Sequence, residues 1–67
     1  MPPHFHAFYG DAEVIVSIGD LEIIDGQFPS KQSKMLLGWA AFHQDELMDN
    51  WNRAKKRLAL HAIDPLR

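Results

Sequence analysis

The chain has 67 residues, a formal net charge of −2 and no cysteine. It is too short for more than one domain, and the lack of cysteine excludes disulfides and thiolate metal sites. No segment approaches the roughly 20 consecutive apolar residues of a membrane span, and no N-terminal run resembles a signal peptide. We therefore expect one cytoplasmic domain over residues 1–67, without membrane association.

Size also bears on how the domain is stabilised. A chain of this length buries only about 60% of the surface that it exposes when unfolded, so its core is marginal. Small domains usually depend on disulfides, a metal or a partner for added stability. The chain has two tryptophans, four phenylalanines and one tyrosine, which is generous for its length. We expect self-association or a small protein partner.

Charge is divided unevenly along the chain. Residues 1–30 carry five acidic and no basic residues (−5), and residues 31–67 carry seven basic and four acidic residues (+3), which together give −2. An acidic half repels phosphate, so nucleic-acid binding is disfavoured and would be confined to the C-terminal end of the predicted helix.

Three strands are predicted in the first 25 residues. They cover His4–Tyr9, Glu13–Ile18 and Leu21–Ile24. Gly10-Asp11 and Gly19-Asp20 are two-residue turn signals, so the strands form an antiparallel meander. Alternation predicts apolar side chains on both faces of this sheet, of which a following helix can cover only one.

A single long periodic stretch follows, from Ser30 to Leu58. Its apolar stripe has a mean step close to the helical 3.6 residues. We predict one long helix with Ser30 as its N-cap, and a break near His43 with Asp45 as the second cap is the alternative. The fold class is therefore α+β: a three-stranded antiparallel meander followed by one long C-terminal helix. The stripe consists of Leu36, Trp39, His43, Leu47, Trp51, Ala54 and Leu58.

An unbroken helix of this length would extend roughly 42 Å, too far for a three-stranded sheet to cover. Its second half would then project and need a second chain. The predicted interface residues are Trp39, Leu47, Trp51 and Leu58. Residues 58–63 either continue the helix or fold back, and Asp64-Pro65 ends any helix.

Histidines are the sharpest chemical feature. His4 and His6 lie on one face of the first predicted strand, so both rings could reach one divalent metal ion, with His43, Glu13 or Asp11 as a third ligand. The main expectation for this pair is instead a polar strand face or hydrogen bonds to backbone near the chain start, and acid–base or nucleic-acid contacts are a further alternative. If His43 faces the sheet, it joins His4, His6 and Tyr9 in a candidate pocket.

No nucleophile or paired carboxylates accompany these histidines, so the sequence predicts no catalytic residue and disfavours an enzyme. The one basic cluster is Arg53, Lys55, Lys56 and Arg57. It complements the negative end of the helix dipole, and phosphate binding is the alternative for it.

Several motifs occur in a fixed order. Pro2-Pro3-His4-Phe5-His6-Ala7 and Tyr9-Gly10 are followed by a helix that reads W-x3-H-x2-E-L-x2-N-W from Trp39 to Trp51. The chain thereby resembles a small bacterial domain of unknown function. The resemblance implies no established activity, although a toxin–antitoxin-like role has been suggested for such domains. Its members usually carry a further strand before this motif, so the first strand here is expected to be an open sheet edge.

Two classes of function follow from these observations. The first is a non-catalytic interaction module that is homodimeric or docks a protein partner. The second is a nucleic-acid-acting domain, because a meander plus helix with a strand histidine resembles HicA-type RNA interferases at the level of the fold. A metal-binding regulator built on His4 and His6 is a third alternative, and no other cofactor is expected.

Overall fold

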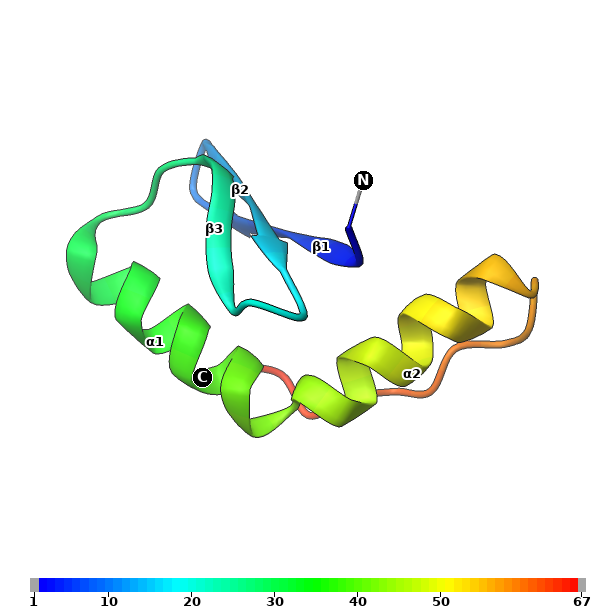
Figure 1. Cartoon of the computed structure of the whole chain (residues 1–67). Coiled ribbons are helices and arrows are strands. Elements are labelled where there is room, and N and C mark those ends of the chain that lie inside the picture. Colours follow the sequence, from blue (N-terminus) through cyan, green and yellow to red (C-terminus); the bar gives the residue numbers. More distant parts are fainter. Residues whose placement is uncertain (1, 67) are drawn as a thin grey trace.

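The computed structural model describes residues 2–66 and contains three strands followed by two helices (Figure 1). Strands β1 (His4–Tyr9), β2 (Ala12–Ser17) and β3 (Glu22–Gly26) form one antiparallel sheet in the order β1-β2-β3. The predicted α+β class and antiparallel meander are confirmed. Because β2 is central, β1 and β3 are both edge strands.

The two turns of the meander differ from each other. Gly10-Asp11 joins β1 to β2 as predicted, with φ of 58° at Gly10, which is the backbone that a type II′ turn requires at its first position. The predicted two-residue turn at Gly19-Asp20 is wrong. Leu21 donates its N–H to the carbonyl of Ser17 at 2.9 Å, which closes a longer turn whose left-handed residue is Leu21, with φ of 55°.

The predicted long helix is broken once, so the uninterrupted form is wrong and the alternative break is correct. Helix α1 covers Ser30–Phe42 and α2 covers Gln44–Lys55, with His43 between them at φ −108° and ψ 19°. The longest dimension of the described chain is 34 Å, shorter than the roughly 42 Å of a straight helix. The break turns α2 back towards the sheet and so allows Leu47 to be buried.

The N-caps of both helices lie one or two residues before the predicted caps. Pro29, not Ser30, is the N-cap of α1, because its carbonyl accepts the first helical hydrogen bond, from the N–H of Ser33 at 2.9 Å. His43, not Asp45, is the N-cap of α2. Asp45 and Glu46 instead fall in the first turn, where their charges face the positive end of the helix dipole.

Helix α2 ends at Lys55, three residues before the predicted Leu58. Arg57 adopts φ of 59°, in the left-handed region. The N–H of Leu58 then donates to the carbonyl of Arg53 at 2.9 Å, and that of Arg57 to Ala54 at 3.2 Å. This pair of bonds is a Schellman motif, which ends the helix and reverses the chain.

The core consists of two apolar clusters between the sheet and the helices. The first joins Val14 and Val16 of β2 to Phe28 and Leu36, and the inward side chains of β1, Phe5 and Ala7, pack against it. The second joins Ile18, which follows β2, to Ala40 of α1 and Leu47 of α2. The predicted alternation along β1 and β2 is therefore confirmed.

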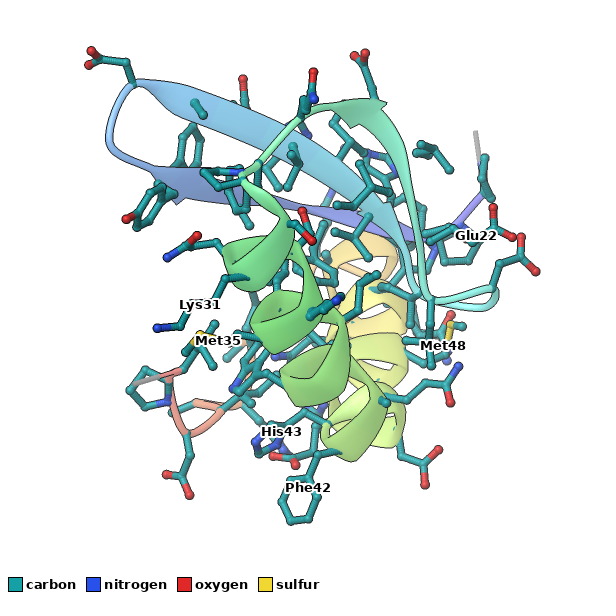
Figure 2. The ribbon with its side chains drawn as sticks, turned by 90° about the vertical axis from the view of Figure 1, so that its left-hand side faces the viewer. Glu22, Lys31, Met35, Phe42, His43 and Met48 are labelled. Atoms are coloured by element: carbon teal, nitrogen blue, oxygen red, sulfur yellow. The ribbon has the colours of Figure 1, made fainter. Side chains whose placement is uncertain are left out.

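Some apolar side chains point away from this core. Figure 2 shows Phe42 projecting from the end of α1, on the side of the molecule opposite the sheet, and its exposed fraction is 85%. Neither α1 nor α2 is long and apolar enough to cross a membrane, and no other helix lies within residues 2–66.

Candidate functional site

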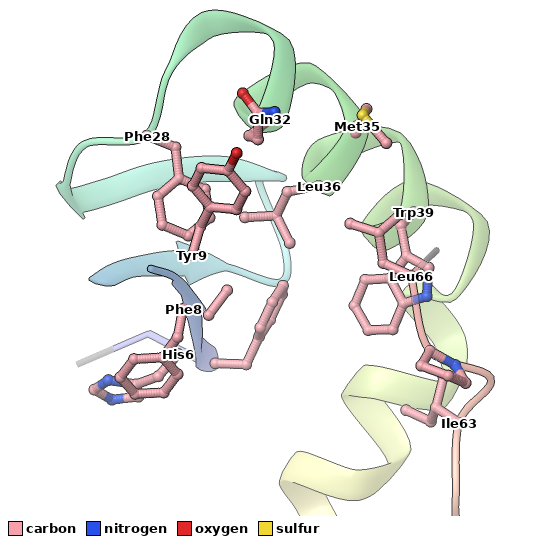
Figure 3. Close-up of a pocket in the computed structure, with 13 residues that line it drawn as sticks. His6, Phe8, Tyr9, Phe28, Gln32, Met35, Leu36, Trp39, Ile63 and Leu66 are labelled. Carbon is pink, nitrogen blue, oxygen red and sulfur yellow. The ribbon is translucent and has the colours of Figure 1, made fainter. Parts of the chain in front are cut away.

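An apolar groove of about 610 Å³ lies along the outer edge of β1, where α1 and the C-terminal segment face that strand (Figure 3). We call it the edge groove. No charged side chain lines it among residues 2–66, and its polar side chains are those of His6 and Gln32, with the Tyr9 hydroxyl and the Trp39 indole N–H. By element, the lining is Phe5, His6, Ala7, Phe8 and Tyr9 of β1; Phe28 before α1; Gln32, Met35, Leu36 and Trp39 of α1; and Ile63, Pro65 and Leu66.

The backbone N–H and C=O groups of successive β1 residues alternate between facing β2 and facing outward from the sheet edge. Ile18 donates its N–H to the carbonyl of Pro3 at 2.9 Å, and the register continues from His4 opposite Ser17 to Tyr9 opposite Ala12. In an antiparallel pair, residues alternate between those bonded to the neighbouring strand and those directed away from it. The N–H and C=O groups of His4, His6 and Phe8 therefore point outward from the sheet edge.

Large apolar side chains around the edge groove are exposed. Phe8 is 72% exposed and Tyr9 51%, while Met35 on α1 and Leu66 on the C-terminal segment are 40% and 44% exposed. Scattered exposed apolar residues are ordinary on a protein surface, but a contiguous set marks a binding surface. All four side chains line the edge groove, which runs beside the edge of β1 that no other strand within residues 2–66 pairs with.

The residues predicted to form a histidine pocket are distributed over two places. His6 and Tyr9 line the edge groove, and the ring of His4 lies 5.6 Å from that of His6. His43 lies elsewhere, on the helix break. Its ring is 5.2 Å from that of Trp39, and its Nδ1 is 2.6 Å from a carboxylate oxygen of Glu46.

The predicted metal pair, His4 and His6, has other neighbours in this structure. Nδ1 of His4 lies 2.9 Å from the carbonyl of Pro2, and Nδ1 of His6 lies 2.8 Å from Oε2 of Glu13. The His4 ring also packs on Trp51, with centroids 5.0 Å apart. Among residues 2–66, no three histidine, aspartate or glutamate side chains are grouped closely enough to hold a metal ion.

The four residues predicted as an interface differ in exposure. Leu47 is buried in the second cluster, and Trp39 and Trp51 are half-buried against it. Leu58 is 52% exposed, just beyond the end of α2. Because α2 turns back at His43, Leu47 and Trp51 pack within the same chain, as Trp39 of α1 also does.

The basic cluster lies at the C-terminal end of α2. Arg53 is engaged with its own chain, since it donates to Oδ2 of Asp49 at 2.9 Å and to the carbonyl of Ala59 at 3.4 Å. Lys55, Lys56 and Arg57 are exposed. Their charges face the negative end of the helix dipole.

Comparison with known families identifies the domain. The profile of a family described as "Domain of unknown function (DUF4160)" matches residues 1–52. The chain belongs to this family. The resemblance seen in the sequence is confirmed at the level of a small domain of unknown function. No curated protein and no solved structure gives a significant match.

The DUF4160 match includes the sheet, α1 and most of α2, and it ends before the C-terminal segment. That segment, residues 58–66, folds back along α2 towards α1 (Figure 1). The sequence allowed residues 58–63 either to continue the helix or to fold back. Ile63, Pro65 and Leu66 were therefore not expected to line the groove. The one local signal was Asp64-Pro65, which excludes a helix there but does not say where the chain goes.

Proposed function

We propose that this protein is a non-catalytic interaction module that associates with a second copy of itself by pairing their β1 strands. The observation that carries the proposal is the state of the β1 edge: it is unpaired within residues 2–66, bears no acidic or basic side chain other than histidine, and exposes Phe8 and Tyr9. Exposed edges of this kind are templates for strand addition.

The outward direction of alternate backbone groups suggests a register for the two paired β1 strands. His4, His6 and Phe8 direct their N–H and C=O groups outward, so two antiparallel copies are best centred on His6. His6 then faces His6 of the second copy, and Phe8 faces His4 of the second copy. Such directly opposed side chains contribute most of the pairing energy in antiparallel sheets. The two meanders would form one continuous six-stranded sheet.

Light scattering on the full chain tests this proposal. Across micromolar to millimolar concentrations we expect a mass that approaches twice the 7.7 kDa of one chain. Phe8→Lys places a charge on the edge and should weaken self-association by about tenfold or more. Phe42→Lys is the matched control, because Phe42 is 85% exposed and lies at the far end of α1. A monomer at every concentration would refute the proposal.

Phosphate binding is the competing proposal, in line with a nucleic-acid-acting or toxin–antitoxin-like role. It rests on the exposed Lys55, Lys56 and Arg57. It predicts RNA binding that weakens steeply as salt increases and that is lost in a triple Lys55→Ser, Lys56→Ser and Arg57→Ser variant. Arg53 supports it less, because its guanidinium is already bonded to Asp49 and Ala59.

A further inference from the structure

The C-terminal segment is held to the domain almost entirely through its backbone. Asn50 donates from Nδ2 to the carbonyl of His61 at 2.8 Å and accepts the N–H of His61 on Oδ1, also at 2.8 Å. One side-chain amide thus satisfies both backbone groups of one residue. A neighbouring strand would do the same in an antiparallel sheet.

Two further side chains bind the same segment. Nε1 of Trp39 donates to the carbonyl of Asp64 at 2.8 Å, and Nη1 of Arg53 donates to that of Ala59 at 3.4 Å. These donors lie on α1 and α2, so they form a row that runs along α2 and continues to α1. Each of these hydrogen bonds goes to a main-chain group, and the row therefore recognises an extended conformation more than a particular sequence. A longer side-chain contact joins Nδ1 of His61 to Oδ2 of Asp49 at 3.9 Å.

Side chains of the segment contribute little to its attachment. Ile63 is half-buried against the second cluster and is the one residue of the segment that packs there. Leu58, Leu60 and Leu66 are 52%, 59% and 44% exposed. A segment with few buried apolar contacts opens more readily than the core does.

The point at which the segment leaves the helix is a suitable hinge. Arg57 is a non-glycine residue in the left-handed region, with φ of 59°, a conformation that is unfavourable for a residue with a side chain. If the segment is released, α2 can continue through Arg57 in the ordinary helical conformation. Release thus relieves the one strained residue of the reversal.

We propose that Trp39 and Asn50 form a binding site for an extended segment, and that a second copy of the chain inserts its own residues 59–64 there in exchange for the segment held in the same chain. The segment of a second copy has the one sequence that the site is seen to hold, so every bond is reproduced. The inference rests on the self-association proposed above and adds a second contact between the copies. Ile63, which also lines the edge groove, would then come from the partner.

Isotope-filtered NMR on the full chain tests the exchange without any substitution. An equimolar mixture of labelled and unlabelled chains should show contacts between the Trp39 indole N–H of one copy and the Ile63 methyl groups of the other. Asn50→Ala should abolish these contacts between copies, whereas Asn52→Ala, on the exposed side of the same helix, should retain them. A dimer by light scattering that shows the contacts only within one chain would overturn this inference and leave the β1 pairing in place.

A free peptide with the sequence of residues 58–67 separates the two proposals if the chain is monomeric. Added in excess to the labelled full chain, it should move the amide signals of residues 58–66 to random-coil positions and leave the Trp39 indole signal unchanged. Asn50→Ala should weaken its binding by about tenfold, because two hydrogen bonds are lost. If the peptide displaces nothing, the binding site is refuted, whatever the oligomeric state.

Discussion

The two edges of the sheet are built in opposite ways. β3 carries Glu22 and Asp25, and its register against β2 shifts between Ile15 and Val16, which leaves Ile24 as an extra, bulged residue. β1 carries neither acidic nor basic side chains other than histidine, has an unbroken register over six residues, and exposes two aromatic rings. Acidic residues and bulges are the means by which proteins prevent edge-to-edge pairing.

The difference between the two edges means that association through the sheet is favoured only at the β1 edge. Pairing of β3 with another β3 would bring carboxylates together, and like charges on opposed strands are unfavourable. Pairing of β1 with another β1 meets no such repulsion. A dimer is therefore the expected end point, because the outer edges of the six-stranded sheet are both β3.

The largest loss of stability is expected at Gly26, where the backbone of β3 lies close to the backbone of β2. Gly26 has φ of 81°, and a Cβ added to it would lie 2.1 Å from the carbonyl oxygen of Glu13. Gly26→Ala should lower the free energy of unfolding by about 3 kcal/mol, through backbone strain and the clash together. Gly10→Ala, at φ of 58° in open space, should cost only about 1 kcal/mol. Equal losses in urea unfolding would contradict this contrast.

A smaller effect is expected when the charges on β3 are removed. A Glu22→Thr and Asp25→Thr double variant keeps strand propensity but leaves the second edge without its carboxylates. Its dimers should associate further through β3, with a gain in affinity of about tenfold, or about 1.4 kcal/mol. Sedimentation velocity would show species larger than a dimer. The same distribution as for the unmodified chain would mean that the bulge at Ile24 alone protects this edge.

The smallest effect concerns the segment that borders the β1 edge. Arg57→Gly places a residue without a side chain in the left-handed position that ends α2, and it should raise the free energy of unfolding by about 0.5–1 kcal/mol. Lys56→Gly, one residue earlier at φ of −90°, should lower it slightly. A loss of stability on Arg57→Gly would show that the reversal does not depend on this conformation.

Much of the fold could be predicted from the sequence because the decisive patterns are local. Alternation correctly separated the two faces within β1 and within β2, and Gly10-Asp11 identified its turn. Which faces are shared follows only from the register, which pairs Phe5 with Val16 and Ala7 with Val14. The helix break was harder to predict. Spacing is unbroken through His43, and only the cap signal at Asp45 pointed to a break. The burial of Leu47 with Ile18, which the bend allows, is a contact that no local pattern contains.

The candidate site could be predicted only in part, for the same reason. The aromatic β1 strand was expected to be an open edge. Of the four residues predicted to form a pocket, His6 and Tyr9 line the edge groove, and His4 and His43 do not. His43 was assigned to that pocket on the condition that it faced the sheet. The bonds of Asn50 to His61 could not be predicted, because they depend on a chain reversal at Arg57, where no glycine signals one.

Amide hydrogen exchange along β1 tests the central claim most directly. The N–H groups of His6 and Phe8 point outward, so in a single copy they exchange freely, whereas those of Ala7 and Tyr9 are bonded to β2. We predict that His6 and Phe8 become protected as protein concentration rises, in step with formation of the dimer. If they exchange as fast at millimolar as at micromolar concentration while a dimer is present, the copies do not pair through β1 and the account is contradicted.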